Sequence, residues 1–405
     1  MSDFFEDPEG RQAAESDLRR FMEPDRTTAL RLAPMYLAVF MAIVTVVGAV
    51  LLRPTGEARP DLSVIGISPD VYDATVESVT PVPCRGTSEG DGIPCVDIVV
   101  RLDEGPDAGT TADFQFPVSE TSPVFTPGDD IVLDHQPDAD PEFAYSYADR
   151  QRRPVLLWVA VLFAAAVVAL GRLRGLAALA GLVASVVVLL QFVIPAIIDG
   201  RSPVLVAVVG AALIAYVALY AAHGFTRMTT VALLGTLAAL GLTALLSWIA
   251  IGAAEFSGFA SDESFILTFA GSIDVGGLIL AGVVLGAVGA IDDVTVTQAS
   301  AVWELHRVRP DLSRLELVRS GLRVGRDHVA STVNTLLLAY AGAAMPLLLF
   351  FVLADQSIGT VLNSEVVATE ALRTLLGSIG LVASVPLTTW MAAFLVGDGN
   401  ASHHH

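Results

Sequence analysis

The sequence predicts an α-helical polytopic membrane protein with about eight transmembrane helices and one small exported domain that resembles a β-barrel. The 405-residue chain is 53% hydrophobic and only 16% charged, whereas soluble domains carry about a quarter charged residues. Apolar runs long enough to cross a bilayer recur along the chain. One hydrophilic stretch interrupts them, and it holds most of the excess acid behind the formal net charge of -20.

Five segments follow from this pattern. They are a cytoplasmic segment at 1–31, a first transmembrane helix at 32–53, an exported acidic β domain at 54–152, a seven-helix membrane domain at 153–397 and a tail at 398–405. The first apolar run is longer than a signal-peptide core and is therefore read as a retained anchor. The terminal histidines of the tail are read as the remains of a purification tag.

Eight apolar runs are predicted to span the membrane. They cover 32–52, 154–170, 176–194, 203–221, 229–251, 275–291, 329–352 and 375–396. Arginines concentrate in the loop at 304–326, so this loop is expected to be cytoplasmic and to carry an interfacial helix. Both termini then lie inside, and residues 54–152 lie outside the cytoplasm.

The exported segment is predicted to be a β domain because alternating apolar and polar residues are separated by turn residues. About five short strands suggest a small barrel of the oligonucleotide/oligosaccharide-binding (OB) shape. Its acidity excludes nucleic acid as a partner, since a phosphate backbone needs a basic face. A rigid module is favoured over a ligand-binding one.

The two cysteines, Cys84 and Cys95, both lie in this exported segment and are expected to form a disulfide. Such a bond would contribute on the order of 3 kcal/mol. With so few cysteines, zinc frameworks of four cysteine or mixed ligands are excluded. No cofactor is expected, and the sequence leaves metal binding open.

The most informative stretch is the glycine-rich run at 273–305. Small residues four apart let a neighbouring helix approach closely, so three glycines are assigned to helix packing: Gly282, Gly286 and Gly289. The same helical face continues as Asp293, Thr297 and Ser300. We assign these three residues, with the adjacent Asp292, to a substrate or ion pathway.

Carboxylates at bilayer depth cost about 2.5 to 3.5 kcal/mol on insertion scales, so those that occur there tend to be functional. For Asp293 this reading is favoured over a position at the wet end of the span. For Asp274, at the other end of the run, a pathway role and a wet helix end are equally supported.

A second polar patch opens the seventh predicted span. Asn334 is a full amide inside the apolar run and is added to the pathway. Arg326 and His328 are expected near a helix start, where they would contact an anion or a partner carboxylate. The alternative for these two residues is a role as interfacial anchors.

These motifs resemble the YibE/F family of bacterial multi-pass membrane proteins. The resemblance is carried by LGAVGAIDDVTVTQAS at 285–300, by GRDHVASTVNTLLLAYAG at 325–342 and by the segment at 145–150. Asp293 and Asn334 align with the family's aspartate and asparagine, whereas Asp292 stands where many members carry an apolar residue. The resemblance implies a location in the bacterial cytoplasmic membrane and a transporter whose substrate is unassigned.

Two function classes remain from the sequence. Motifs of metalloproteases, α/β-hydrolases and P-loop proteins are missing, so no enzyme is expected. The first class is a transporter or channel for a small ion or solute, in contact with the lipid bilayer. The second is a membrane scaffold or sensor whose exported domain binds an envelope partner. Homo-oligomerisation is compatible with both.

Overall fold

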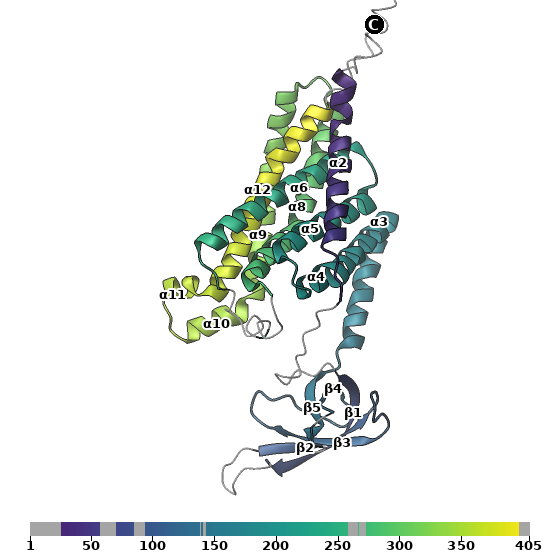
Figure 1. Cartoon of the computed structure of the whole chain (residues 1–405), viewed down its shortest axis with the longest axis vertical. Coiled ribbons are helices and arrows are strands. Elements are labelled where there is room, and N and C mark those ends of the chain that lie inside the picture. Colours follow the sequence, from purple (N-terminus) through teal and green to yellow (C-terminus); the bar gives the residue numbers. More distant parts are fainter. Residues whose placement is uncertain are drawn as a thin grey trace, which may run out of the picture. The chain divides into compact units, whose positions relative to one another are not determined.

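The computed structural model describes residues 26–56, 70–84, 94–137, 139–140, 143–257, 266 and 273–396. The chain forms two compact units (Figure 1). The β unit is Pro60–Ala169, and the membrane unit combines Met1–Arg59 with Leu170–His405. The terminal histidines lie outside the described residues.

The β unit is a curled antiparallel sheet of five strands. The strands are β1 (Val71–Pro83), β2 (Pro94–Leu102), β3 (Thr111–Pro117), β4 (Asp130–His135) and β5 (Tyr145–Arg150). Their order in the sheet is β3-β2-β1-β4-β5, and each neighbouring pair is antiparallel. The sheet curls enough to bring the edge strands near each other, since the rings of Phe116 on β3 and Tyr147 on β5 lie 5.4 Å apart.

The alternation expected from the sequence places one side of these strands in a common core. Ile98, Val100 and Leu102 on β2 are buried against Ile131 and Leu133 on β4. Cys84 and Cys95 are joined by a disulfide with Cα atoms 5.0 Å apart, as predicted. The bond links the end of β1 to the start of β2 and so closes the hairpin that begins the sheet.

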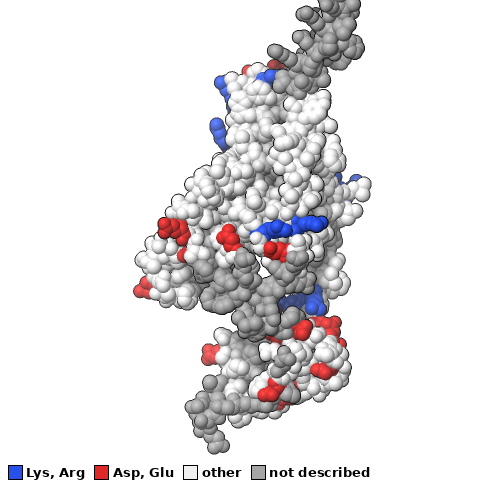
Figure 2. Space-filling view, in the orientation of Figure 1, with Lys and Arg blue, Asp and Glu red and all other residues white. Residues whose placement is uncertain are grey.

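Long apolar helices make up the membrane unit, and one of them begins in the β unit and enters the membrane unit after Ala169. They are α2 (Arg26–Leu51), α3 (Arg153–Val188), η3 (Leu189–Val193), α4 (Ile194–Ile198), α5 (Pro203–His223), α6 (Arg227–Ala253), α8 (Val275–Val308), α9 (Arg314–Ala343), α10 (Met345–Leu353), α11 (Ile358–Asn363) and α12 (Glu365–Val396). Within the described ranges, six helices are long and apolar enough to cross a membrane, or seven if α9 and α10 form one bent span. The visible face of this unit carries few charged side chains (Figure 2).

This count differs from the expected eight because two predicted spans, 154–170 and 176–194, lie in one helical run of 46 residues, Arg153–Ile198. The backbone at Arg172 is nevertheless non-helical, with φ 51° and ψ -127°. The seventh predicted span is broken instead: α9 and α10 meet at 61°. Pro346 at the start of α10 explains this break, because proline cannot donate the backbone hydrogen bond that a continuous helix needs.

The core of the membrane unit depends on reciprocal packing between α6 and α12. Gly235 on α6 faces the hydroxyl of Thr388 on α12, and Gly380 on α12 faces the hydroxyl of Thr243 on α6. Both threonines are fully buried. The two pairings run in opposite order along the chain, so the helices are antiparallel, and each glycine leaves the space that a threonine of the partner helix fills.

We expect loss of the disulfide to destabilise the β unit. Replacing Cys84 and Cys95 with alanine removes the constraint that the bond places on the unfolded chain, at a cost of about 2–4 kcal/mol. Urea-dependent proteolysis of the full chain measures this change. Reductant should lower the stability of the β unit in the parent protein to the same extent and leave that of the variant unchanged. A parent protein whose cysteines both alkylate without reductant would contradict the pairing.

We expect Gly380→Ala to lower the apparent melting temperature in detergent, because the added methyl group overlaps Thr243 Oγ1. Overpacking of this kind costs about 1–3 kcal/mol. The second change Thr243→Ala should restore most of the loss by vacating the space. Gly241→Ala on α6 is the matched control, since a Cβ there meets no neighbouring atom within 4 Å. Equal effects of Gly380→Ala and Gly241→Ala would refute the packing argument.

Candidate functional site

The helix α8 lies at the centre of the membrane unit and contacts four others: α5, α6, α9 and α12. Its most buried face includes Ile291 and Val294, which pack in the main hydrophobic cluster. The helix continues well past the predicted end of its span at residue 291, as far as Val308. Asp292 and Asp293 therefore lie in the middle of a 34-residue helix rather than at its end.

One strip of α8 is exposed, and it contains several of the residues that the sequence singled out. The exposed members are Gly286, Gly289, Asp293, Thr297 and Ser300, and the half-buried Gly282 continues the strip. A Cβ at Gly289 would meet no described atom within 4 Å. The strip of α8, defined by these six residues, is thus largely uncovered within the described chain.

Asp292 faces a different direction from Asp293. Leu285 and Ala299 lie one heptad before and after Asp292, on the same helical face. Leu285 packs against the cluster that contains Val206 of α5, and Ala299 packs beside Leu219 of α5. Asp292 therefore faces α5. Its Oδ1 atom is buried and has no hydrogen-bond partner among the described residues.

At its glycine end, the strip of α8 accommodates polar groups from two other helices. The guanidinium of Arg373 on α12 lies over Gly282, at 3.0 Å from the position that a Cβ would occupy. The hydroxyl of Tyr340 on α9 lies at 2.6 Å from the corresponding position at Gly286. These glycines therefore make room for side chains rather than for a helix backbone.

Arg373 pairs with Glu370 at 2.5 Å, and their side chains are 26% and 31% exposed. The predicted span at 375–396 leaves Arg373 in the segment that precedes it. Instead α12 begins at Glu365, so both ionic groups lie within the helix. The sequence gave no signal of this, because hydropathy detects the apolar run and not the helix that extends beyond it.

The predicted residues of α9 are distributed along its exposed side. Asn334 and Arg326 are exposed, and His328 is half-buried with an unpartnered Nε2 atom. The helix begins at Arg314 with a capping box formed by Ser313 and Glu316. Because this start precedes Arg326 by twelve residues, neither Arg326 nor His328 lies at a helix N-terminus, and the expected position at a helix start is wrong. Their contact with an anion or a partner carboxylate stays a prediction.

Asp274 has a structural task. Its Oδ1 atom accepts a hydrogen bond of 2.9 Å from the backbone N–H of Gly277, and it forms the N-cap of α8. N-capping satisfies one of the unpaired donors of the first helical turn. Of the two readings that the sequence left open, this geometry favours the helix end.

Two buried polar contacts join α8 to its neighbours, and sequence reasoning missed both. The amide of Gln298 donates to Gly321 O on α9 at 2.8 Å and to Thr389 Oγ1 on α12 at 2.7 Å. The hydroxyls of Thr295 and of Thr236 on α6 lie 2.7 Å apart. These side chains fix the orientation of α8, and thereby the direction in which its two aspartates point.

The described residues contain no cluster of three or more His, Cys, Asp or Glu side chains that would hold a metal ion. The geometry instead offers one half-buried carboxylate with a buried Oδ1 atom, one exposed carboxylate and a polar strip that ends at an arginine. Carboxylates on membrane helices are typical of sites that bind a cation or a proton.

Comparison with known proteins assigns the family. No curated protein and no solved structure matches this chain. The family model described as YibE/F-like protein matches residues 159–398, which include α8, α9 and both aspartates. The match covers more than half of the chain and agrees with the motifs at 285–300 and 325–342. This membrane-embedded chain therefore belongs to the family of YibE/F-like proteins.

Proposed function

We propose that this protein moves a small ion or solute across the membrane, with the strip of α8 lining the pathway and Asp292 and Asp293 binding the ion or a coupled proton. A catalytic role is not part of this proposal. The observation that carries it concerns Asp292, in the middle of α8. Its Oδ1 atom is buried and has no hydrogen-bond partner among the described residues. A buried carboxylate oxygen without a partner is costly, and a bound cation or proton would offset that cost.

The adjacent Asp293 strengthens this proposal. Two neighbouring carboxylates repel each other when both are ionised, so a proton or a cation stabilises the pair. Asp293 lies on the exposed strip, whereas Asp292 faces α5, and the pair therefore connects the open side of α8 to its packed side.

The polar groups along the strip of α8 support a continuous path. Arg373 and the hydroxyl of Tyr340 lie over the glycine end, Asp293 lies in the middle, and Thr297 and Ser300 follow. Asn334 on the neighbouring α9 is a further candidate for this path. Polar side chains that are exposed on membrane helices line a water-filled cavity or contact another protein surface more readily than lipid.

The proposal extends to topology. We propose eight spans, with the non-helical backbone at Arg172 separating two of them, because the run of 46 residues is about twice the length that one span needs. Both termini would be cytoplasmic in a bacterial cytoplasmic membrane. The β unit would be exported, and its strand order together with the approach of β3 to β5 supports an OB-like barrel.

We expect Asp292→Asn and Asp293→Asn each to lower flux about tenfold or more, because a charge-assisted contact to the ion is worth about 1.5–3 kcal/mol. Both changes keep the side-chain volume nearly constant, so packing should survive them. Flux is measured in liposomes with indicators for H⁺, Na⁺, K⁺ and Cl⁻.

Asp355→Asn is the matched control for both aspartates. This residue is exposed outside the long helices and has a positive φ of 52°, a conformation that asparagine tolerates well. Its flux should equal that of the parent protein. If both site variants fold as monodisperse proteins and retain full flux for every ion that the parent moves, the proposed pathway is wrong.

We expect a cysteine at Pro310, in the turn between α8 and α9, to be inaccessible to an impermeant thiol reagent added outside intact cells. Pro310 is exposed and lies among the arginines that the positive-inside rule assigns to the cytoplasm. A cysteine at the exposed Thr121 of the β unit should react in the same assay. The reverse labelling pattern would show that the chain has the opposite orientation in the membrane.

A further inference from the structure

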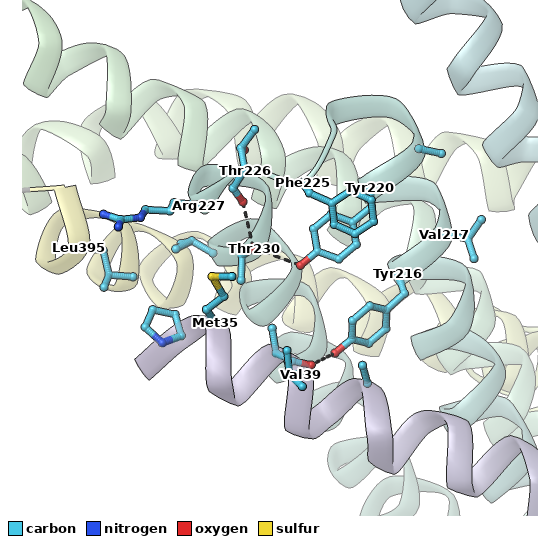
Figure 3. A pocket seen from close by; sticks show the side chains of 15 residues that line it. Met35, Val39, Tyr216, Val217, Tyr220, Phe225, Thr226, Arg227, Thr230 and Leu395 are labelled. Carbon is cyan, nitrogen blue, oxygen red and sulfur yellow. Dashed lines mark hydrogen bonds between the residues drawn. The ribbon is translucent and has the colours of Figure 1, made fainter. Parts of the chain in front are cut away.

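A large apolar cavity lies within the membrane unit, away from the proposed pathway. Its volume is about 640 Å³, within the range typical of ligand pockets. The N-terminal half of α2 forms one wall, α5 and α6 form the others, and Leu395 of α12 closes one end (Figure 3). The apolar lining includes Met35, Val39, Val217 and Phe225.

The polar groups along the walls already have partners. The hydroxyl of Tyr216 donates to Ala38 O on α2 at 2.6 Å. The hydroxyls of Tyr220 and Thr230 lie 3.1 Å apart, and Thr230 also donates to Thr226 O at 2.9 Å. The walls therefore offer few free donors or acceptors to an occupant. A peptide backbone would leave its own N–H and C=O groups unpaired there, whereas a hydrocarbon chain has none to satisfy.

Arg227 is the one ionisable cation among the residues that line the cavity. It is exposed, and it makes no ion pair or side-chain hydrogen bond with the described residues. Figure 3 shows its guanidinium near Leu395, at the end of the cavity away from Tyr216. Arg227 is also the first residue of α6, a helix of 27 residues, so the positive end of the helix dipole adds to its charge.

We propose that this cavity binds one anionic phospholipid, with an acyl chain between α2 and α5 and its phosphate on Arg227. An apolar wall beside a single unpaired guanidinium matches an amphiphile that carries one negative group. Guanidinium also forms bidentate hydrogen bonds with phosphate. The site does not depend on the proposed transport function, since it shares no residue with the strip of α8.

Native mass spectrometry of the full chain in detergent tests this site. The protein is titrated with phosphatidylglycerol and, separately, with phosphatidylcholine. We expect one phosphatidylglycerol to bind in preference to phosphatidylcholine. Arg227→Gln should weaken phosphatidylglycerol binding about fivefold, since one arginine near an anionic lipid is worth about 1 kcal/mol. Val39→Trp should fill the cavity and weaken the binding of both lipids.

The matched control is Arg323→Gln on α9, which removes an exposed arginine that does not line the cavity. It should leave binding unchanged. In the unmodified protein, phosphatidylglycerol with a photoreactive acyl chain should crosslink to α2 and α5, which tests the site even if a variant misfolds. Equal binding of the two lipids, equal effects of the two arginine variants, or competition by inorganic phosphate alone would overturn the proposal.

Discussion

The antiparallel contact between α6 and α12 is the interaction on which the membrane unit depends. Each helix carries a glycine and a threonine eight residues apart, and each glycine receives the threonine of the partner. The hydroxyl of Thr243 is satisfied on its own helix by Ala239 O at 2.9 Å. Close approach therefore comes from matching shapes rather than from a hydrogen bond between the helices, as expected where no hydrophobic effect drives helix association.

This contact determines the environment of α8. Gly235 also lies against Thr295 of α8, and Gly380 lies against Ile291 of the same helix. With α6 and α12 close together on one side, and α5 and α9 on the others, α8 retains a single exposed strip. Two aspartates that are adjacent in the chain consequently occupy different surroundings. The half-buried Asp292 gives the proposed pathway its strongest support, although the sequence favoured the exposed Asp293.

The membrane class, the position of most spans, the strands of the β unit and the cysteine pair were predictable from the sequence. Each of these features depends on local composition or on periodicity along one segment. Core residues of β2 and β4 alternate as the sequence indicates. Asn334 was also identifiable, because a polar residue inside an apolar run is visible without any knowledge of its neighbours. The two aspartates were identifiable because they directly follow the glycine-rich apolar run at 275–291.

The tertiary structure decided which side chains meet. Hydropathy did not reveal that α12 begins at Glu365, that α9 begins at Arg314 or that Pro346 separates α10 from α9. It also gave no indication that Gly282 lies under Arg373, or that α2 and α5 enclose a cavity beside Arg227. The sequence determines which residues a helix carries on each face. Only the packing of several helices determines which of those faces is covered, because that depends on contacts between segments far apart in the chain.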